Sequence, residues 1–181
     1  MTLRLFDGFL GRGEHAAAQC ASNDSGAHAS SGVVCLRTPV EGTVVSLEEV
    51  PDPVFSKGML GPGVAIMPSS GVVRAPLPGL VSAVFPTGHA LGLTCDNGLE
   101  LLIHIGIDTV ELGGEYFETL VSRGDHVEAG QALVNFEIEG ITEAGYNPIV
   151  PVLVSNGASL ASLTFQLAGE RAGDYLIEAK M

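Results

Sequence analysis

From about residue 33 onward, the chain is a succession of short apolar runs separated by turn-forming residues. The 24 glycines and 10 prolines supply most of the turns. Short segments rich in Val, Ile and Leu and bounded by such residues are typical of strands rather than helices. An all-β domain over residues 33–181 is therefore predicted, and its strand candidates are VVSLEEV, GVAIMP, GLVSAVFP, HALGLTC, LELLIHIGI, ALVNFEIE and IVPVLVS.

An internal repeat indicates how these strands are arranged. RTPVEGTV at 37–44 is matched by RAPLPGLV at 74–81, both with the pattern R-x-P-x-x-G-x-V. One repetition is too little for a solenoid. It predicts two equivalent hairpins in a pseudo-symmetric sandwich. The pattern G-D-x-V-x-x-G at 124–130 predicts a further tight turn, residues 155–166 a short helix capped by Ser155, and residues 174–179 a last strand.

The first 32 residues differ in character from the rest. Residues 11–32 are small and polar, which predicts a flexible linker. Ahead of it, Leu3, Phe6 and Leu10 share a helical face, so residues 3–10 could form a short amphipathic helix that touches a membrane or a partner. So short a helix is marginal by itself, and an unstructured start is the alternative.

The charge balance restricts the partners. Lys and Arg number 8 against 21 Asp and Glu, which gives a formal net charge of −13. Such a field repels nucleic acid and anionic lipid head groups, and it attracts basic protein partners. We therefore expect no nucleic-acid binding.

The sequence also predicts a cytoplasmic location. No apolar run approaches the roughly 20 residues of a membrane span. The first residues are too short and too interrupted by Asp7 for a signal-peptide core. Cys20, Cys35 and Cys95 are odd in number and lack metal-ligand spacing, which indicates a reducing compartment.

The stretch LELLIHIGIDTVEL at 99–112 carries the first candidate site. In a strand, alternate side chains share a face. Apolar side chains occupy every odd position from Leu99 to Ile107 and would form the core face, so His104 and Asp108 project from the other face. Gly106 lies bare between them and would let another chain or a ligand approach the histidine.

A second histidine can be placed beside the first. In HALGLTC at 89–95, alternation puts His89 on one face with Leu91, Leu93 and Cys95. If this strand pairs antiparallel with 99–105 across the turn at 96–98, His89 would lie opposite His104.

Two facing histidines in an apolar setting favour phosphoryl-transfer chemistry. A neutral imidazole such as that of His104 is a good nucleophile near pH 7. His89, oriented by Thr87, could donate a hydrogen bond to the charge that develops on the transferred group. Apolar surroundings would protect a phosphohistidine from water. Positive charge would have to come from a docking partner, since no Lys or Arg lies near these histidines in the sequence.

At these residues the sequence resembles the glucose-type enzyme IIA family of the bacterial phosphoenolpyruvate-dependent sugar phosphotransferase system. The resemblance spans about residues 37–170. It rests on motifs that occur in the family's order, namely Gly42, VPDPVF at 50–55, GPGVAI at 61–66, Ala75-Pro76, Gly79, TGHA at 87–90 and LIHIGIDTVEL at 102–112.

The resemblance implies an antiparallel β-sandwich or barrel with a few short helical turns. It implies that His104 is the phosphoryl acceptor, that His89 supports the phosphoryl group and that Thr87 hydrogen-bonds His89. Such a phosphotransferase takes phosphate from the phosphocarrier HPr and passes it to a IIB domain during uptake of a glucose, N-acetylglucosamine or glucoside-type sugar. It needs no cofactor or metal, although incidental zinc at His89 and His104 is conceivable.

The resemblance also implies a docking surface. Asp52 and Asp108 match carboxylates that meet basic residues of both partners, and Phe55 and Phe85 match the apolar rim. Leu91, Leu102 and Ile105 stand where the family often has phenylalanine, and we expect them to keep the rim apolar.

Family members also bind and inhibit regulatory target proteins when unphosphorylated. Because the chain begins with its own Met and carries no IIB or IIC segment, a stand-alone IIA protein is expected, with an excised part of a fused permease as the alternative.

Two other classes of protein share parts of these motifs. H-x-G-x-D also resembles half of the zinc site in lysostaphin-type β-sheet peptidases, so a zinc hydrolase that uses His89, His104 and Asp108 is the alternative function. That family needs a later H-x-H, whereas His126 is the only histidine after His104. A biotinyl or lipoyl carrier would need a lysine at a hairpin tip, and neither Lys57 nor Lys180 has that context.

Overall fold

The computed structural model describes residues 33–165 and 175–180. The predicted flexible segment 1–32, with its candidate helix over 3–10, lies outside the described residues. Strands dominate, and they are β1 (Val33–Arg37), β2 (Gly42–Ser46), β3 (Gly63–Pro68), β4 (Val72–Arg74), β5 (Gly79–Val84), β6 (Ala90–Cys95), β7 (Glu100–His104), β8 (Phe117–Thr119), β9 (His126–Val127), β10 (Ala132–Phe136), β11 (Val150–Val154), β12 (Ser162–Phe165) and β13 (Tyr175–Lys180).

Only short helices interrupt the strands in the described part of the chain. The α-helices are α2 (Pro53–Ser56) and α3 (Ile138–Glu143), and the 3-10 turns are η1 (Leu47–Glu49), η2 (Thr109–Leu112) and η3 (Gly157–Ser159). None of the described helices is long and apolar enough to cross a membrane. The prediction of an all-β fold with a few short helical turns is confirmed.

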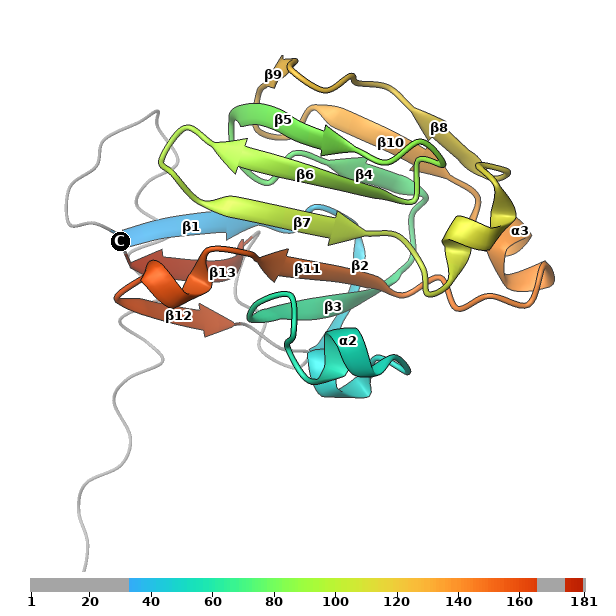
Figure 1. The fold of residues 1–181 in the computed structure, drawn as a ribbon, viewed down its shortest axis with the longest axis horizontal. Helices are drawn as coiled ribbons and strands as arrows, with labels where there is room; N and C mark the ends of the chain where they lie inside the picture. The colour runs from blue at the N-terminus through green and yellow to red at the C-terminus, as the bar shows by residue number, and fades with distance from the viewer. Residues whose placement is uncertain (1–32, 166–174, 181) are drawn as a thin grey trace, which may run out of the picture.

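The strands form three antiparallel sheets. The largest has the order β2-β3-β11-β7-β6-β5-β9, and the two smaller ones have the orders β1-β13-β12 and β4-β10-β8. Figure 1 shows β4 and β10 behind β5 and β6 of the large sheet. Side chains from all three sheets fill the main core, among them Leu36, Val73, Leu91, Leu133 and Leu176. The architecture is therefore the sandwich that the resemblance implies.

The sandwich has the internal symmetry that the sequence repeat predicts. One half contains β1–β3 and β11–β13, and the other is the continuous segment from β4 to β10. In each half, the repeat joins a strand of a small sheet to a hairpin of the large one, β2–β3 or β5–β6. The two repeats contact each other reciprocally: the Arg37 N–H donates to the Pro76 carbonyl at 3.4 Å, and the Arg74 N–H donates to the Pro39 carbonyl at 2.8 Å.

A second, smaller core lies on the other face of the large sheet. Its members come from η1, α2, β3 and β11 and from the segments that follow β7 and precede β11, and they are Leu47, Val50, Phe55, Ala65, Ile107, Ile149 and Leu153. The 47–62 connection folds over this face because both of its helical turns are capped, η1 by a Ser46–Glu49 capping box and α2 by the Asp52 side chain.

The prediction of a short helix over residues 155–166 is wrong. The described part of this segment contains one turn of 3-10 helix followed by β12, and the Asn156 side chain bonds the Glu100 N–H at 3.0 Å and the Gly98 carbonyl at 2.8 Å instead of capping a helix. Cys35 is disulfide-bonded, which contradicts the expectation of reduced thiols, whereas Cys95 is a free thiol in the core. The tight turn before β10 and a last strand, observed at 175–180, are confirmed.

Candidate functional site

His104 is the last residue of β7, and the turn that follows fixes its ring. Gly106 has a positive φ of 76°, and its carbonyl oxygen lies 2.8 Å from His104 Nδ1. A carbonyl can only accept a hydrogen bond, so Nδ1 carries the proton. Nε2 is therefore the nitrogen with the free lone pair when the ring is neutral.

His89 reaches His104 from the neighbouring connection. Thr87 Oγ1 hydrogen-bonds His89 Nδ1, and the His89 carbonyl accepts from the Ile105 N–H at 2.6 Å. The two imidazole rings lie with their centroids 5.0 Å apart and their planes at 70°.

The predicted strand register differs from the observed one by a single residue. Ala90, not His89, pairs with His104, because the chain turns at Gly88 with φ 71° and β6 begins only after His89. Leu91 and Leu93 consequently face the main core opposite Ile103 and Leu101. The side chain of His89 still meets His104, but from the turn rather than from the strand.

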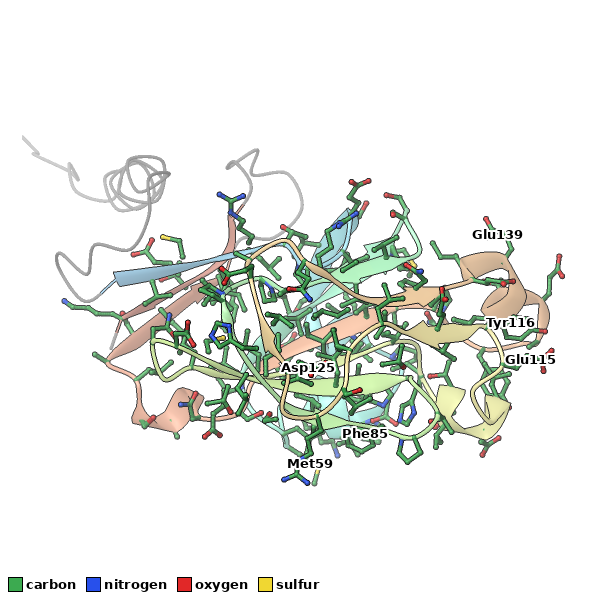
Figure 2. All side chains as sticks on the ribbon, turned by 90° about the horizontal axis from the view of Figure 1, so that it is seen from above. Met59, Phe85, Glu115, Tyr116, Asp125 and Glu139 are labelled. Atoms are coloured by element: carbon green, nitrogen blue, oxygen red, sulfur yellow. The ribbon has the colours of Figure 1, made fainter. Side chains whose placement is uncertain are left out.

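Two aromatic rings flank the histidines. The Phe55 ring centroid lies 5.0 Å from that of His104, and the Phe85 centroid lies 5.4 Å from that of His89. Phe55 is 6% exposed in the small core, whereas Phe85 is 42% exposed. In Figure 2, Phe85 lies along the same edge of the molecule as Met59, which is also exposed. Further exposed apolar side chains in the neighbouring segments are Val54, Leu60 and Val110.

Burial keeps both imidazoles neutral. It lowers the pKa of His104 to about 4, against the smaller opposing effects of the Gly106 hydrogen bond and of the Asp52 and Asp108 charges. Burial also lowers the pKa of His89. Near pH 7 the site therefore presents a neutral His104 ring whose Nε2 lone pair is free.

The two predicted carboxylates, Asp52 and Asp108, differ in their hydrogen bonds. Asp52 caps α2, with Oδ1 accepting from the Val54 N–H at 2.7 Å and from the Phe55 N–H at 3.4 Å. Asp108 precedes η2 in a left-handed conformation with φ 58°, and its exposed side chain makes no capping bond. Asp108 thus leaves its carboxylate available at the surface.

Several predicted rim residues are not at the surface. Leu91 and Ile105 are fully buried in the main core, so the prediction that they line a docking rim is wrong. Leu91 points inward because β6 pairs one residue out of the predicted register. Ile105 points inward because it shares the core face with Leu101 and Ile103, as alternation along 99–107 predicts. Leu102 is half-buried against the small core. Gly106 is also buried, so it does not open an approach to His104, and its carbonyl instead accepts a hydrogen bond from the His104 ring.

The alternative zinc site is not formed. In residues 33–165 and 175–180, no group of three or more His, Cys, Asp or Glu side chains is placed to hold a metal ion. His89 and His104 face each other, whereas Asp108 lies beyond the Gly106 turn on the exposed surface.

Two residues that support the site were not singled out from the sequence. Thr109 is buried beneath the Gly106 turn, and Asn147 braces that turn from the other side. For Thr109 a signal existed, because it is an uncharged polar residue directly after the Gly106–Asp108 turn. For Asn147 there was none, because its contact spans 40 residues of sequence.

Comparison with known proteins identifies the class of protein. Residues 34–160 match the family model described as phosphoenolpyruvate-dependent sugar phosphotransferase system, EIIA 1. The glucose-specific EIIA component of Staphylococcus aureus (strain MSSA476) is 48% identical over 130 residues, which is 72% of this chain and 78% of that protein.

A solved structure agrees with this match. The glucose permease IIA from Mycoplasma capricolum superposes with a TM-score of 0.72 at 34% identity, covering 81% of this chain and 95% of that one. The chain therefore belongs to the EIIA 1 family and is a phosphoryl-carrier IIA component of the phosphoenolpyruvate-dependent sugar phosphotransferase system.

Proposed function

We propose that His104 accepts a phosphoryl group from phosphorylated HPr on Nε2 and passes it to a IIB domain in the cytoplasm. The sugar is of the glucose, N-acetylglucosamine or glucoside type. The hydrogen bond from His104 Nδ1 to the Gly106 carbonyl is the observation that carries this proposal, because it leaves Nε2 unprotonated and free to attack. No metal or cofactor takes part.

His89 has the complementary task. To bond a phosphoryl oxygen near His104, His89 must carry its proton on Nε2, and the Thr87 hydroxyl then donates to Nδ1. The two histidines thus hold opposite tautomers, one as nucleophile and one as donor. The donor gains importance as charge develops on the transferred group.

The partners supply the missing positive charge. The charges that act on the pKa of His104 are those of His89, Asp52 and Asp108, none of which is a permanent cation. Basic residues on HPr and on the IIB domain would pair with the two carboxylates as they bring positive charge to the phosphoryl group.

The apolar rim around the histidines is the second part of the docking surface. Phe85 and the exposed side chains Val54, Met59, Leu60 and Val110 supply its accessible area. Burying them against a partner would exclude water from the transfer. The same rim could bind regulatory targets, and phosphorylation would oppose this by adding roughly two negative charges.

The test is the intact mass of the protein after incubation with phosphoenolpyruvate, enzyme I and HPr. We expect one acid-labile phosphoryl group on the wild type and none on His104→Gln. His126→Gln is the matched control, because His126 is exposed and paired with Asp96 at 2.9 Å, away from the site. Phosphorylation of His104→Gln, or none of the wild type, would disprove the proposal.

A further inference from the structure

Thr109 is a polar residue with no exposed surface and no part in the chemistry described so far. It is the first residue of η2, and its exposed fraction is 0%. Its hydroxyl donates to the Ile105 carbonyl at 2.5 Å. Its methyl group lies against Gly106, where an added Cβ would clash with Thr109 Cγ2. Thr109 therefore fills the inside of the turn that follows His104.

This turn holds two successive peptide groups with all four polar atoms bonded. In the first, the Ile105 carbonyl accepts from Thr109, and the Gly106 N–H donates to the Ile149 carbonyl at 2.9 Å. In the second, the Gly106 carbonyl accepts from His104 Nδ1, and the Ile107 N–H donates to the Asn147 carbonyl at 2.9 Å. Thr109 is the only side chain besides His104 itself that bonds these two peptide groups among the described residues.

We propose that Thr109 is a positioning residue that aims the Gly106 carbonyl at His104 Nδ1 and thereby directs phosphorylation to Nε2. The inference rests on the proposed role of His104 as acceptor. Without the Thr109 hydroxyl, the Ile105 carbonyl has no partner in a buried place and the first peptide group can rotate. The adjoining Gly106 carbonyl then loses its fixed direction, and the proton of His104 can move to Nε2.

The chemistry shows why this direction matters. In the transfer, the Nε2 lone pair forms the new N–P bond while the N–P bond of the donor phosphohistidine breaks, and that electron pair stays on the donor nitrogen. No proton leaves His104, so its ring gains positive charge. The Gly106 carbonyl stabilises this charge through the Nδ1–H. A ring protonated on Nε2 has no lone pair there and cannot react at that atom.

Three variants test the role of the hydroxyl. Thr109→Val removes it and keeps the shape, and Thr109→Ser keeps it and removes the methyl group. Thr142→Val is the matched control, because Thr142 donates to the carbonyl four residues earlier at 2.8 Å, as Thr109 does, but on the exposed surface of α3. The measurements are the ¹⁵N chemical shifts of the His104 ring, the ³¹P spectrum of the phosphorylated protein and the rate of phosphoryl acceptance.

We expect wild type, Thr109→Ser and Thr142→Val to hold the His104 proton on Nδ1 and to be phosphorylated on Nε2 only. Thr109→Val should show a detectable Nε2–H tautomer and accept phosphate about tenfold more slowly. A purely structural role would lower the melting temperature without changing the tautomer.

A wild-type tautomer and rate in Thr109→Val would overturn the inference, even if that variant melts earlier. If Thr109→Val does not fold, Thr109→Ser and Thr109→Ala decide, because they differ only in the hydroxyl. The ¹⁵N measurement is made on the unphosphorylated protein, so it tests the role of Thr109 independently of whether His104 accepts phosphate. A wild type that is never phosphorylated on His104 would instead contradict the proposed function.

Discussion

The two halves of the sandwich have equivalent strands but different connections at the site. In one half, residues 47–62 join β2 to β3, form two capped helical turns and bury Phe55 in a small core of its own. In the other, residues 85–89 join β5 to β6 as a tight turn, closed by the Gly88 N–H to Phe85 carbonyl bond at 2.8 Å. The first connection packs Phe55 against His104, and the second places His89 beside His104.

This difference shows how a duplicated scaffold acquires a single site. The strands repeat, but the long connection supplies an apolar cover over His104 and the short one supplies His89. Each histidine thus has one aromatic neighbour, from a different half, and the two aromatics differ sharply in exposure. The covering connection should matter most for stability, and the short one for transfer.

The largest expected effect is on stability, from Phe55→Ala. Removing a buried aromatic ring from the small core should lower the free energy of unfolding by about 3–5 kcal/mol. Phe85→Ala, its counterpart in the short connection, should cost less than about 1 kcal/mol because the ring is 42% exposed. Urea denaturation of both variants checks this, and equal costs would show that the two connections do not differ as described.

The next effect is on transfer, from His89→Gln. This variant should accept phosphate at nearly the wild-type rate but donate it to the IIB domain about 10²–10³-fold more slowly, because the transition state loses the hydrogen bond from the imidazole N–H. The two half-reactions can be timed separately with purified phosphorylated proteins. Wild-type rates in both would refute the two-histidine mechanism.

The burial of His104 should make the stability of the protein depend on pH. The unfolded histidine takes up a proton near pH 6.5, whereas burial lowers the pKa of the folded one to about 4. The unfolded state therefore binds more protons between these values, so stability is full above pH 6.5 and falls as the pH drops toward 4. The shift corresponds to a loss of about 3 kcal/mol.

Two variants isolate this contribution. Urea denaturation at pH 7 and pH 4.5 should show a smaller loss in His104→Gln than in wild type, whereas Thr142→Val, an exposed change that removes no titratable group, should lose as much as wild type. An identical loss in His104→Gln would mean that other groups cause the acid sensitivity.

The smallest effect is expected from Thr87→Val in the short connection. Losing the hydrogen bond to His89 Nδ1 should slow phosphoryl donation about tenfold while leaving acceptance unchanged. Thr43→Val, an exposed change on β2 in the other half, is the control. If donation by Thr87→Val is unaffected, His89 is oriented by its surroundings alone.

The strands and the repeat could be predicted from the sequence because turn residues and β-branched runs are local signals. The register of β6 could not. HALGLTC is apolar on both faces, so alternation does not decide which face is inward, and a shift of one residue exchanges them. The bend at Gly88 settles the matter, and it places Leu91 in the core and His89 in the turn.

Long-range contacts account for the other errors. Ser155-Asn-Gly looks like a helix start, but Asn156 is used by β7 and the turn before it. The capping box at Ser46 and Glu49 was a local signal for η1, which was predicted as part of a strand. The pair His89 and His104 was found because both residues flank one hairpin, whereas Phe55 and Asp52 were expected only from the resemblance.

The reciprocal bonds between the two repeats join halves that differ in their course along the chain. The half with both histidines is continuous from β4 to β10, whereas the other half is complete only when β11–β13 have been added to β1–β3. On a ribosome, the continuous half can pair its strands before the last residues are made, whereas the small core around Phe55 also needs Leu153 of β11. We therefore expect the β6–β7 hairpin beside the two histidines to form before this small core is complete.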